Sequence, residues 1–355
     1  MESLLDDLDY ITKIDKEDML GAIRGFPSDA RRTSNQIKNL NIDEYCDRDF
    51  DSVLVVGMGG SAIGGLLLRD WLRGECNIPI NVSRSYHIPG WVYQNTLVFA
   101  VSYSGNTEET LSQLEEAIER GCKVVSYCSG GKMREIAEKN GFPIVLFPEG
   151  YKPRAAIASQ FYSLAGIVHK IGLLSESKWE EVEESINVVE DHIDGYEKKV
   201  PVEDNEAKKL AEEIKGYIPF IYGSKLFETV AYRYCTQFNE NSKSPAATNF
   251  FPEAFHNSVM ASEGVNELLN TSCGIFLTDP MERDPIKTKA TNFKRILKGK
   301  FGKIIDVEAK GKGELARIMS TINLGDFVSA YLGILYGRDP SEMESIVRLK
   351  RESKT

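Results

Sequence analysis

An uninterrupted apolar run that ends in a glycine-rich turn constrains this sequence more than any other feature. Residues 51–72 read DSVLVVGMGGSAIGGLLLRDWL, which is a short apolar strand, a turn rich in glycine, and an apolar helix. A strand that is apolar on both faces must be covered on both sides, and this is typical of a parallel sheet between layers of helices. The same alternation returns in TLVFAVSYSGNTEETLSQLEEAIERG and in CKVVSYCSGGKMREIAEKN. The sequence therefore predicts an α/β fold.

A second series of strands and helices begins near residue 217. YIPFIYGSKLFETVAYRYC opens it, and the strands TSCGIFLTDP and GKIIDVEAKG follow with the helix KTKATNFKRILKGK between them. ELARIMSTINLGDFVSAYLGILYG then reads as a long apolar helix. The layout repeats that of the first half, but the turns have lost the glycine pair and the hydroxyl cluster. We predict a duplicated fold of two parallel sheets, each flanked by helices on both faces, with the chemistry of the turns in the first copy.

Shifts in composition mark the expected domain boundaries. The chain has 355 residues, which suggests about two domains. We expect a helical leader over 1–44, a first domain over 45–180 and an acidic helix with a linker over 181–206. A second domain follows over 207–337, and a helical tail over 338–355 ends the chain.

Charge and hydropathy argue against several classes of protein. The formal net charge is −10 and the pI is about 5.2, so the chain as a whole repels nucleic acid. The most basic segment, residues 287–303, has the pattern of a solvated helix face. The acidic, amphipathic N-terminus does not resemble a signal peptide, and no apolar run reaches the ~20 residues of a membrane span. We expect a cytoplasmic protein that binds neither nucleic acid nor membranes.

The cysteines and histidines do not have the spacing of a metal site. There are six cysteines and four histidines, no CxxC pair occurs, and the histidines are far apart in the sequence. We therefore expect no metal, no disulfide framework and no redox cofactor.

The first glycine-rich turn leaves three interpretations open. GMGGSAIGG follows a strand and opens a helix, so its backbone could approach an anion at the helix N-terminus. A nicotinamide dinucleotide fold would use Gly57, Gly59 and Ala62, but the acidic residue expected about 20 positions later is missing. The turn could also serve only for close packing of strand and helix.

The second turn favours a phosphate monoester. SYSGNTEE places three hydroxyl side chains, Ser102, Ser104 and Thr107, around Gly105 at the start of a helix. Hydroxyls and first-turn N–H groups together can surround a phosphate, whereas simple capping of the helix needs a single hydroxyl. No lysine of the Walker type is present, which disfavours nucleoside triphosphates.

These two turns resemble the sugar isomerase (SIS) domain, and a chain with two such domains is similar to the bifunctional phosphoglucose/phosphomannose isomerase family. The similar segments are GGS, SYSGNT, KPRAA, FNENSK, FHN and IVRLK, spread from about residue 45 to the C-terminus. The resemblance implies two SIS domains and an aldose–ketose isomerase, without a cofactor, that interconverts glucose 6-phosphate and mannose 6-phosphate with fructose 6-phosphate through a cis-enediol. It also implies a place in glycolysis and gluconeogenesis. The residues that would hold the phosphate are Ser61, Ser102, Ser104 and Thr107, with the backbone of Gly59 and Gly60.

The resemblance also implies roles for four catalytic residues. Glu240 in FNENSK would be the base that moves a proton between C2 and C1, and Arg154 in KPRAA would stabilise the enediolate. His256 in FHN would open the sugar ring in the active site of the neighbouring subunit, which implies a homodimer. Lys350 in IVRLK would assist ring opening. Glu253 is a competing candidate for the base, because it lies close to His256 in the sequence.

One departure from the family concerns the mannose activity. The family has a threonine shortly before the C-terminal lysine, and that threonine is linked to acceptance of mannose 6-phosphate. Here the segment DPSEMESIVRLK offers Ser341 and Ser345 but no threonine. A serine hydroxyl could replace it, so the sequence predicts the glucose activity more firmly than the mannose activity.

Two other functions remain open at this stage. An amino-sugar phosphate isomerase would share the turns, but the N-terminal glutaminase domain of such synthases, with its terminal cysteine, is not recognisable here. A phosphosugar-binding regulator without turnover would need only the turns, and it would leave Glu240, His256 and Arg154 without a task.

Overall fold

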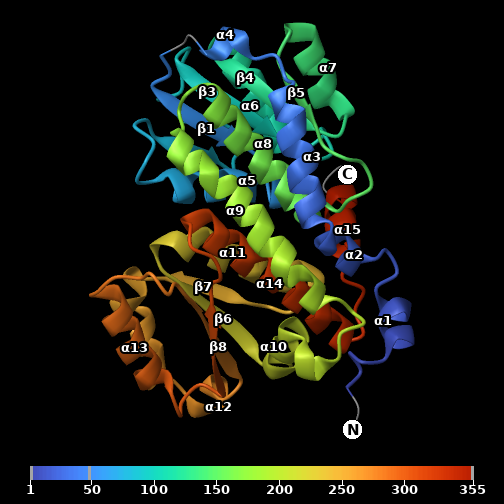
Figure 1. The fold of residues 1–355 in the computed structure, drawn as a ribbon, viewed down its shortest axis with the longest axis vertical. Coiled ribbons are helices and arrows are strands. Elements are labelled where there is room, and N and C mark those ends of the chain that lie inside the picture. The colour runs from blue at the N-terminus through green and yellow to red at the C-terminus, as the bar shows by residue number, and fades with distance from the viewer. Residues whose placement is uncertain (1–2, 47–48, 353–355) are drawn as a thin grey trace. The chain divides into compact units, whose positions relative to one another are not determined.

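A computed structural model describes residues 3–46 and 49–352, and these divide into two compact units. The first-sheet unit comprises Gly25–Asn187 and Gly313–Leu315. The second-sheet unit comprises Met1–Arg24, Val188–Lys312 and Ala316–Thr355. The predicted parallel sheets with flanking helices are confirmed in both units (Figure 1). The domain boundaries given above stay a prediction.

The first sheet has five parallel strands in the order β2-β1-β3-β4-β5. Its strands are β1 (Ser52–Val56), β2 (Ile80–Ser83), β3 (Thr96–Val101), β4 (Lys123–Cys128) and β5 (Ile144–Leu146). Every residue of β1 and β3 is buried, as their unbroken apolar sequences predict. The register pairs Val53 with Ile80 on one side and with Leu97 on the other.

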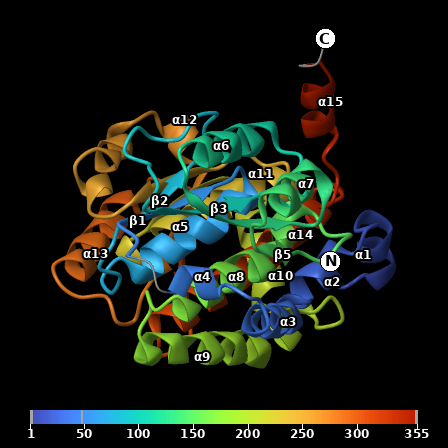
Figure 2. The same cartoon turned by 90° about the horizontal axis from the view of Figure 1, so that it is seen from above.

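Helices cover both faces of the first sheet. From β1 the chain runs outward through α5 to β2, whereas from β3 it runs the opposite way through α6 and α7, so right-handed crossovers place α5 opposite α6 and α7 (Figure 2). Helix α5 lies close on β1, because a Cβ at Gly65 would come within 2.7 Å of Val55 Cγ1. The helices of this unit are α3 (Phe26–Lys38), α4 (Asp43–Cys46), α5 (Gly60–Leu72), α6 (Glu108–Glu119), α7 (Gly131–Asn140), η1 (Pro153–Ala156) and α8 (Ile157–Lys170).

The second sheet has four parallel strands in the order β7-β6-β8-β9. They are β6 (Ile218–Gly223), β7 (Ala247–Phe250), β8 (Ser272–Thr278) and β9 (Lys303–Glu308). Helix α11 (Glu228–Asn241) connects β6 to β7, and α13 (Ile286–Leu297) connects β8 to β9. An aromatic cluster forms the core on the α13 side, with Tyr222, Phe251, Phe276 and Phe293 in mutual ring contact.

The remaining helices of the chain are short except for two. They are α1 (Leu8–Ile14), α2 (Met19–Arg24), α9 (Glu176–Ile193), η2 (Asp194–Tyr196), η3 (Val202–Asp204), α10 (Glu206–Ile214), η4 (Lys225–Phe227), η5 (Glu253–Phe255), η6 (Ser258–Glu263), α12 (Asn266–Leu269), α14 (Glu314–Leu335) and α15 (Glu344–Glu352). Helix α9 overlaps the start of the acidic segment 181–206, and its side chains Val182, Ile186 and Val189 are buried.

Helix α14 is the long apolar helix that the segment ELARIMSTINLGDFVSAYLGILYG predicts. Within residues 3–46 and 49–352 it is the one helix with the length and composition to cross a membrane, and its most apolar stretch is wholly buried inside the structure. Burial of this kind is typical of a core helix.

Candidate functional site

The two candidate turns of the first-sheet unit meet at one point on the edge of its sheet. Strands β1 and β3 are neighbours, yet the connections that leave them run in opposite directions. In open α/β sheets ligands bind beyond the carboxyl ends of the strands at such a switch point. The turn after β1 contains Gly59, Gly60 and Ser61, and the turn after β3 runs from Ser102 to Thr107. We call this place the first crevice.

The turn after β1 packs directly against the KPRAA segment. Gly59 has a φ of +52° and precedes α5, so its backbone takes a conformation that favours glycine. A Cβ at Gly60 would lie 3.1 Å from the backbone of Pro153 and Arg154. Arg154 itself is 2% exposed and lies in η1. The structure therefore brings Arg154 to the N-terminus of α5, although these residues are more than 90 positions apart in the sequence.

The hydroxyls of the turn after β3 are not equivalent. Ser102 is fully buried, and its Oγ donates to Thr107 Oγ1 at 2.9 Å and accepts from the Thr107 backbone N–H at 3.4 Å. Ser104 is exposed, and Thr107 is half-buried at the start of α6. Ser104 and Thr107 can therefore reach a ligand from solvent, whereas Ser102 holds the turn closed.

Backbone contacts hold this turn against the end of β4. Gly105 has a φ of +67°, and a Cβ there would come within 1.7 Å of the carbonyl oxygen of Gly130. The Asn106 side chain accepts from the Lys132 backbone N–H at 3.1 Å. The turn thus has a fixed shape before any ligand arrives, which lowers the entropic cost of binding.

Ser61 joins the two turns. It is 5% exposed, and its Oγ accepts a hydrogen bond from the Tyr103 backbone N–H at 3.3 Å. The first crevice therefore brings together all the predicted phosphate residues and the backbone of Arg154. Tyr103 was missed in the sequence, although it stands inside the SYSGNT segment between two hydroxyl residues that were singled out.

The other predicted catalytic residues belong to the second-sheet unit. Glu240 is half-buried in the last turn of α11. That helix is fixed to α14 by Arg233, which pairs with Asp326 at 2.6 and 3.0 Å inside the protein. Burial raises the pKa of Asp326, while the guanidinium opposes that shift. Lys243 Nζ donates to the Glu240 carbonyl oxygen at 2.8 Å and to that of Asp339 at 2.7 Å, so the end of α11 is also tied to the segment that leads to α15.

His256 and Lys350 are both exposed to solvent. His256 follows η5, and Lys350 lies on α15, a helix without a buried residue. Glu253, the competing candidate, is exposed and accepts a hydrogen bond from the Asn257 side chain at 3.0 Å. The other three histidines have partners of a structural kind: His87 contacts Glu116, His169 stacks on Trp179, and His192 bonds to the Val188 carbonyl group.

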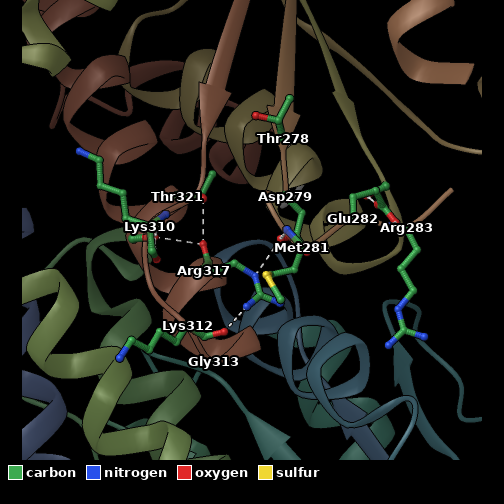
Figure 3. Close-up of polar contacts among 12 residues, drawn as sticks. Thr278, Asp279, Met281, Glu282, Arg283, Lys310, Lys312, Gly313, Arg317 and Thr321 are labelled. Atoms are coloured by element: carbon green, nitrogen blue, oxygen red, sulfur yellow. Dashed lines mark hydrogen bonds and ion pairs between the residues drawn. The ribbon is translucent and has the colours of Figure 1, made fainter. Parts of the chain in front are cut away.

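The second sheet has a crevice at its own switch point, between β6 and β8. A cavity of about 320 Å³ opens there, with Phe251 and Phe276 in its wall. Ser224, after β6, donates to Glu282. Arg317 pairs with Asp279 at 2.9 Å (Figure 3). The charged side chains of the cavity wall are Asp279, Glu282, Lys287, Lys294, Asp306 and Glu308. Four carboxylates against two lysines disfavour a phosphate in this second crevice.

Metal ligands are not clustered in the parts of the chain that the structure describes. Residues 3–46 and 49–352 contain no group of three or more His, Cys, Asp or Glu side chains that could hold an ion. All six cysteines are free thiols, and burial raises the pKa of Cys273 to about 12.

The fold and the first crevice define a class of protein, the double SIS-domain proteins. Residues 203–352 match the model of the bacterial phospho-glucose isomerase C-terminal SIS domain. The fold is shared with the solved C-terminal domain of glucosamine-fructose-6-phosphate aminotransferase from Francisella tularensis, with a TM-score of 0.71 and 17% identity. That comparison covers 91% of this chain and 98% of the solved one.

Similar sequences identify the family within this class. The chain is 38% identical over 337 residues to a bifunctional phosphoglucose/phosphomannose isomerase of Caldicellulosiruptor bescii, covering 94% of this chain and 98% of the relative. It is 37% identical over 309 residues to a protein of the same name from Aquifex aeolicus, covering 86% of this chain and 91% of the relative. The chain belongs to the bifunctional phosphoglucose/phosphomannose isomerase family, as the resemblance of its motifs predicts.

Proposed function

We propose that this protein is an aldose–ketose isomerase that interconverts glucose 6-phosphate and mannose 6-phosphate with fructose 6-phosphate. The observation that carries the proposal is the 38% identity, over 94% of this chain, to a protein named for both activities. The first crevice supports it, because exposed hydroxyls and a helix N-terminus suit the phosphate of a hexose 6-phosphate.

In the proposed site the phosphate lies against Ser104 and Thr107 and the first-turn N–H groups of α6. Ser61 and Ser102 complete the set: the Ser61 hydroxyl joins the two turns, and the Ser102 hydroxyl closes the turn after β3 by its hydrogen bond to Thr107. The backbone of Gly59 and Gly60 lines the same side. In this proposal these residues hold only the phosphate, and the catalytic residues act on carbons C1 and C2 of the sugar.

The proton transfer is assigned to Glu240. Starting from the open-chain ketose, its carboxylate takes a proton from C1, and the electron pair of that C–H bond forms the C1–C2 double bond while the carbonyl oxygen takes up the negative charge. The Arg154 guanidinium stabilises the resulting cis-enediolate without exchanging protons. A proton then passes from O1 to the neighbouring O2 of the cis-enediol, so that the negative charge moves to O1. Return of the first proton to C2 converts the C1–O1 group into the aldehyde, and it gives glucose 6-phosphate on one face and mannose 6-phosphate on the other.

Ring opening is assigned to His256 of the partner subunit with help from Lys350, in a homodimer. Three large apolar side chains shortly after His256 support an interface there, because Met260, Val265 and Leu268 are 58–68% exposed. Apolar side chains that gather on a surface mark sites of protein association. We further infer a cytoplasmic enzyme of glycolysis and gluconeogenesis that needs no cofactor and binds neither nucleic acid nor membranes.

The test of the activity is incubation of the purified protein with fructose 6-phosphate, with both aldose products resolved separately. Formation of both products, lost in Glu240→Gln and kept in the matched variant Glu253→Gln, is the expected result. Glucose 6-phosphate alone would restrict the activity and give meaning to the missing threonine. Binding of fructose 6-phosphate without turnover would refute the isomerase and leave a regulator, and production of an amino-sugar phosphate from ammonia would point to the amino-sugar enzyme.

The homodimer has a sharper test in mixed subunits. Glu240→Gln and His256→Ala chains are each expected to be inactive. When they are mixed, a site that takes Glu240 from one chain and His256 from the other is intact once in every heterodimer, so about a quarter of the normal activity returns. If both residues came from one chain, every site would carry a lesion and no activity would return.

A further inference from the structure

Tyr103 stands between Ser102 and Ser104, but its side chain leaves the first crevice and crosses to the end of β5. The ring stacks on Phe147 with centroids 6.1 Å apart and an interplanar angle of 13°. The phenol donates to the Pro148 carbonyl oxygen at 2.6 Å and accepts from the Tyr151 backbone N–H at 2.9 Å. The side chain is 8% exposed. The Tyr103 side chain is therefore a buried, noncovalent link between the turn after β3 and the loop after β5.

The backbone of Tyr103 joins the other strand ends. Its N–H donates to Ser61 Oγ in the turn after β1, as described above. Its carbonyl oxygen accepts from the Ser129 backbone N–H at 2.8 Å and from Ser129 Oγ at 2.7 Å, directly after β4. One residue thus holds the ends of β1, β3, β4 and β5 together.

The loop that the phenol holds leads into Arg154. Residues 147–152 connect β5 to η1, whose second residue is Arg154. The middle of the loop is exposed, and Gly150 has a φ of +91°. An exposed loop of this kind needs a fixed point if it is to hold the following arginine in one position. The two groups that the Tyr103 phenol binds are both backbone groups of this loop. Burial also raises the pKa of the phenol, so that it stays a hydrogen-bond donor across the working pH of an enzyme.

We propose that Tyr103 is a positioning residue that fixes Arg154 relative to the turn after β3. The inference rests on the proposed function, in which the turn holds the phosphate and Arg154 stabilises the enediolate. Removal of the phenolic hydroxyl leaves Ser104 and Thr107 in place, so the substrate still binds. It frees the loop before Arg154, and a misplacement of about 1 Å in such a group can cost up to a hundredfold in rate.

The experiment compares Tyr103→Phe with the matched variant Tyr127→Phe. Tyr127 lies in β4, is fully buried and has its ring 6.3 Å from the same Phe147, but its hydroxyl has no hydrogen-bond partner among the described residues. Tyr103→Phe is expected to lower kcat by about tenfold to a hundredfold with less than about a twofold change in KM and in inhibition by inorganic phosphate. Tyr127→Phe should leave all three unchanged.

A double-variant cycle separates positioning from general loosening of the fold. If Tyr103 acts through Arg154, adding Tyr103→Phe to Arg154→Ala lowers kcat no further. Equal behaviour of the two tyrosine variants, or full additivity with Arg154→Ala, would overturn the inference while the wild-type enzyme stays active. Failure of the wild-type protein to isomerise fructose 6-phosphate would instead refute the proposed function.

Discussion

The turn after β3 and the turn after β8 occupy corresponding places in their sheets, but they carry opposite chemistry. After β3 stand Ser102, Ser104, Gly105 and Thr107, and after β8 stands the segment from Asp279 to Arg283, with two carboxylates. Both turns lie at a switch point, where the strand geometry favours a ligand. Hydroxyls and a tight glycine favour an anion, whereas buried and half-buried carboxylates repel it. The two sheets thus share a place that suits a ligand, and in the proposed function the residues of the turns decide which of the two places binds the phosphate.

Among the variants that test this difference between the two turns, Gly105→Ala in the first crevice has the largest expected effect. A Cβ at Gly105 would lie 1.7 Å from the Gly130 carbonyl oxygen, so Gly105→Ala must displace the whole turn. We expect a loss of isomerase activity of more than about a hundredfold, with most of it in KM. Met281→Ala, in the turn after β8, changes a side chain that is 67% exposed and should alter activity by less than twofold. Steady-state kinetics on both variants would decide, and equal losses would contradict the assignment.

The buried ion pair of the second crevice should matter for stability and not for phosphate. The Asp279 and Arg317 side chains are 8% and 6% exposed, so Asp279→Ala leaves a buried guanidinium without its carboxylate. We expect a loss of about 3 kcal/mol in the free energy of unfolding, measured by denaturant titration, and unchanged inhibition by inorganic phosphate. The control is Asp306→Ala, which breaks an exposed pair with Lys294 and should cost less than about 1 kcal/mol. Stronger phosphate inhibition in Asp279→Ala would mean that the second crevice holds the anion, because the variant removes a repelling carboxylate there.

Removal of a single hydroxyl from either crevice is expected to have a smaller effect, which separates the two crevices by KM. Ser104→Ala removes an exposed hydroxyl from the first crevice and should raise the KM for fructose 6-phosphate by about tenfold, because hydrogen bonds to charged groups are worth about 1.5–3 kcal/mol. Thr278→Ala removes a hydroxyl at the end of β8, where it donates to the Val307 carbonyl oxygen at 3.2 Å. This variant should leave KM unchanged. A rise in KM for Thr278→Ala alone would reverse the roles of the two crevices.

The smallest expected effect concerns how the first-sheet unit responds to acid. Burial acts to raise the pKa of Glu181, but hydrogen bonds from Lys178, the Leu315 backbone N–H and Trp71 outweigh it and hold the pKa below 4.5. A carboxyl group with a lowered folded-state pKa stabilises the fold above its unfolded pKa and loses that stabilisation as pH falls through the folded value.

Glu181→Gln should therefore be less stable than the wild type by about 1 kcal/mol at pH 7, and the gap should narrow below pH 4.5. Thermal unfolding from pH 3 to pH 7 measures it. Glu183→Gln, which changes a side chain that is 65% exposed and paired with Arg31, should show a smaller gap at every pH. A Glu181→Gln gap that widens on acidification would contradict the sign of the pKa shift.

Secondary structure was predictable where burial leaves a clear pattern. The strands β1 and β3 are wholly buried and β4 is buried after Lys123, in keeping with their mainly apolar sequences, and α13 shows a helical repeat with only Phe293 and Leu297 buried. Strand β7 was missed, because ATNF has four residues, lies at the sheet edge and has no buried side chain. An edge strand of this kind is formed by backbone pairing with β6, and side-chain hydropathy does not report it.

The sequence by itself determined the class of fold, the two hydroxyl-bearing turns and the chemistry that they suit, because glycines, hydroxyls and apolar runs act through local geometry and burial. Tertiary structure alone decided that Ser102 is buried behind Ser104, that Arg154 packs at the N-terminus of α5, and that Tyr103 links four strand ends. These contacts join residues that the parallel sheet brings to one edge from distant parts of the chain. Their cause is the order of the strands, which the pattern of any single segment does not contain.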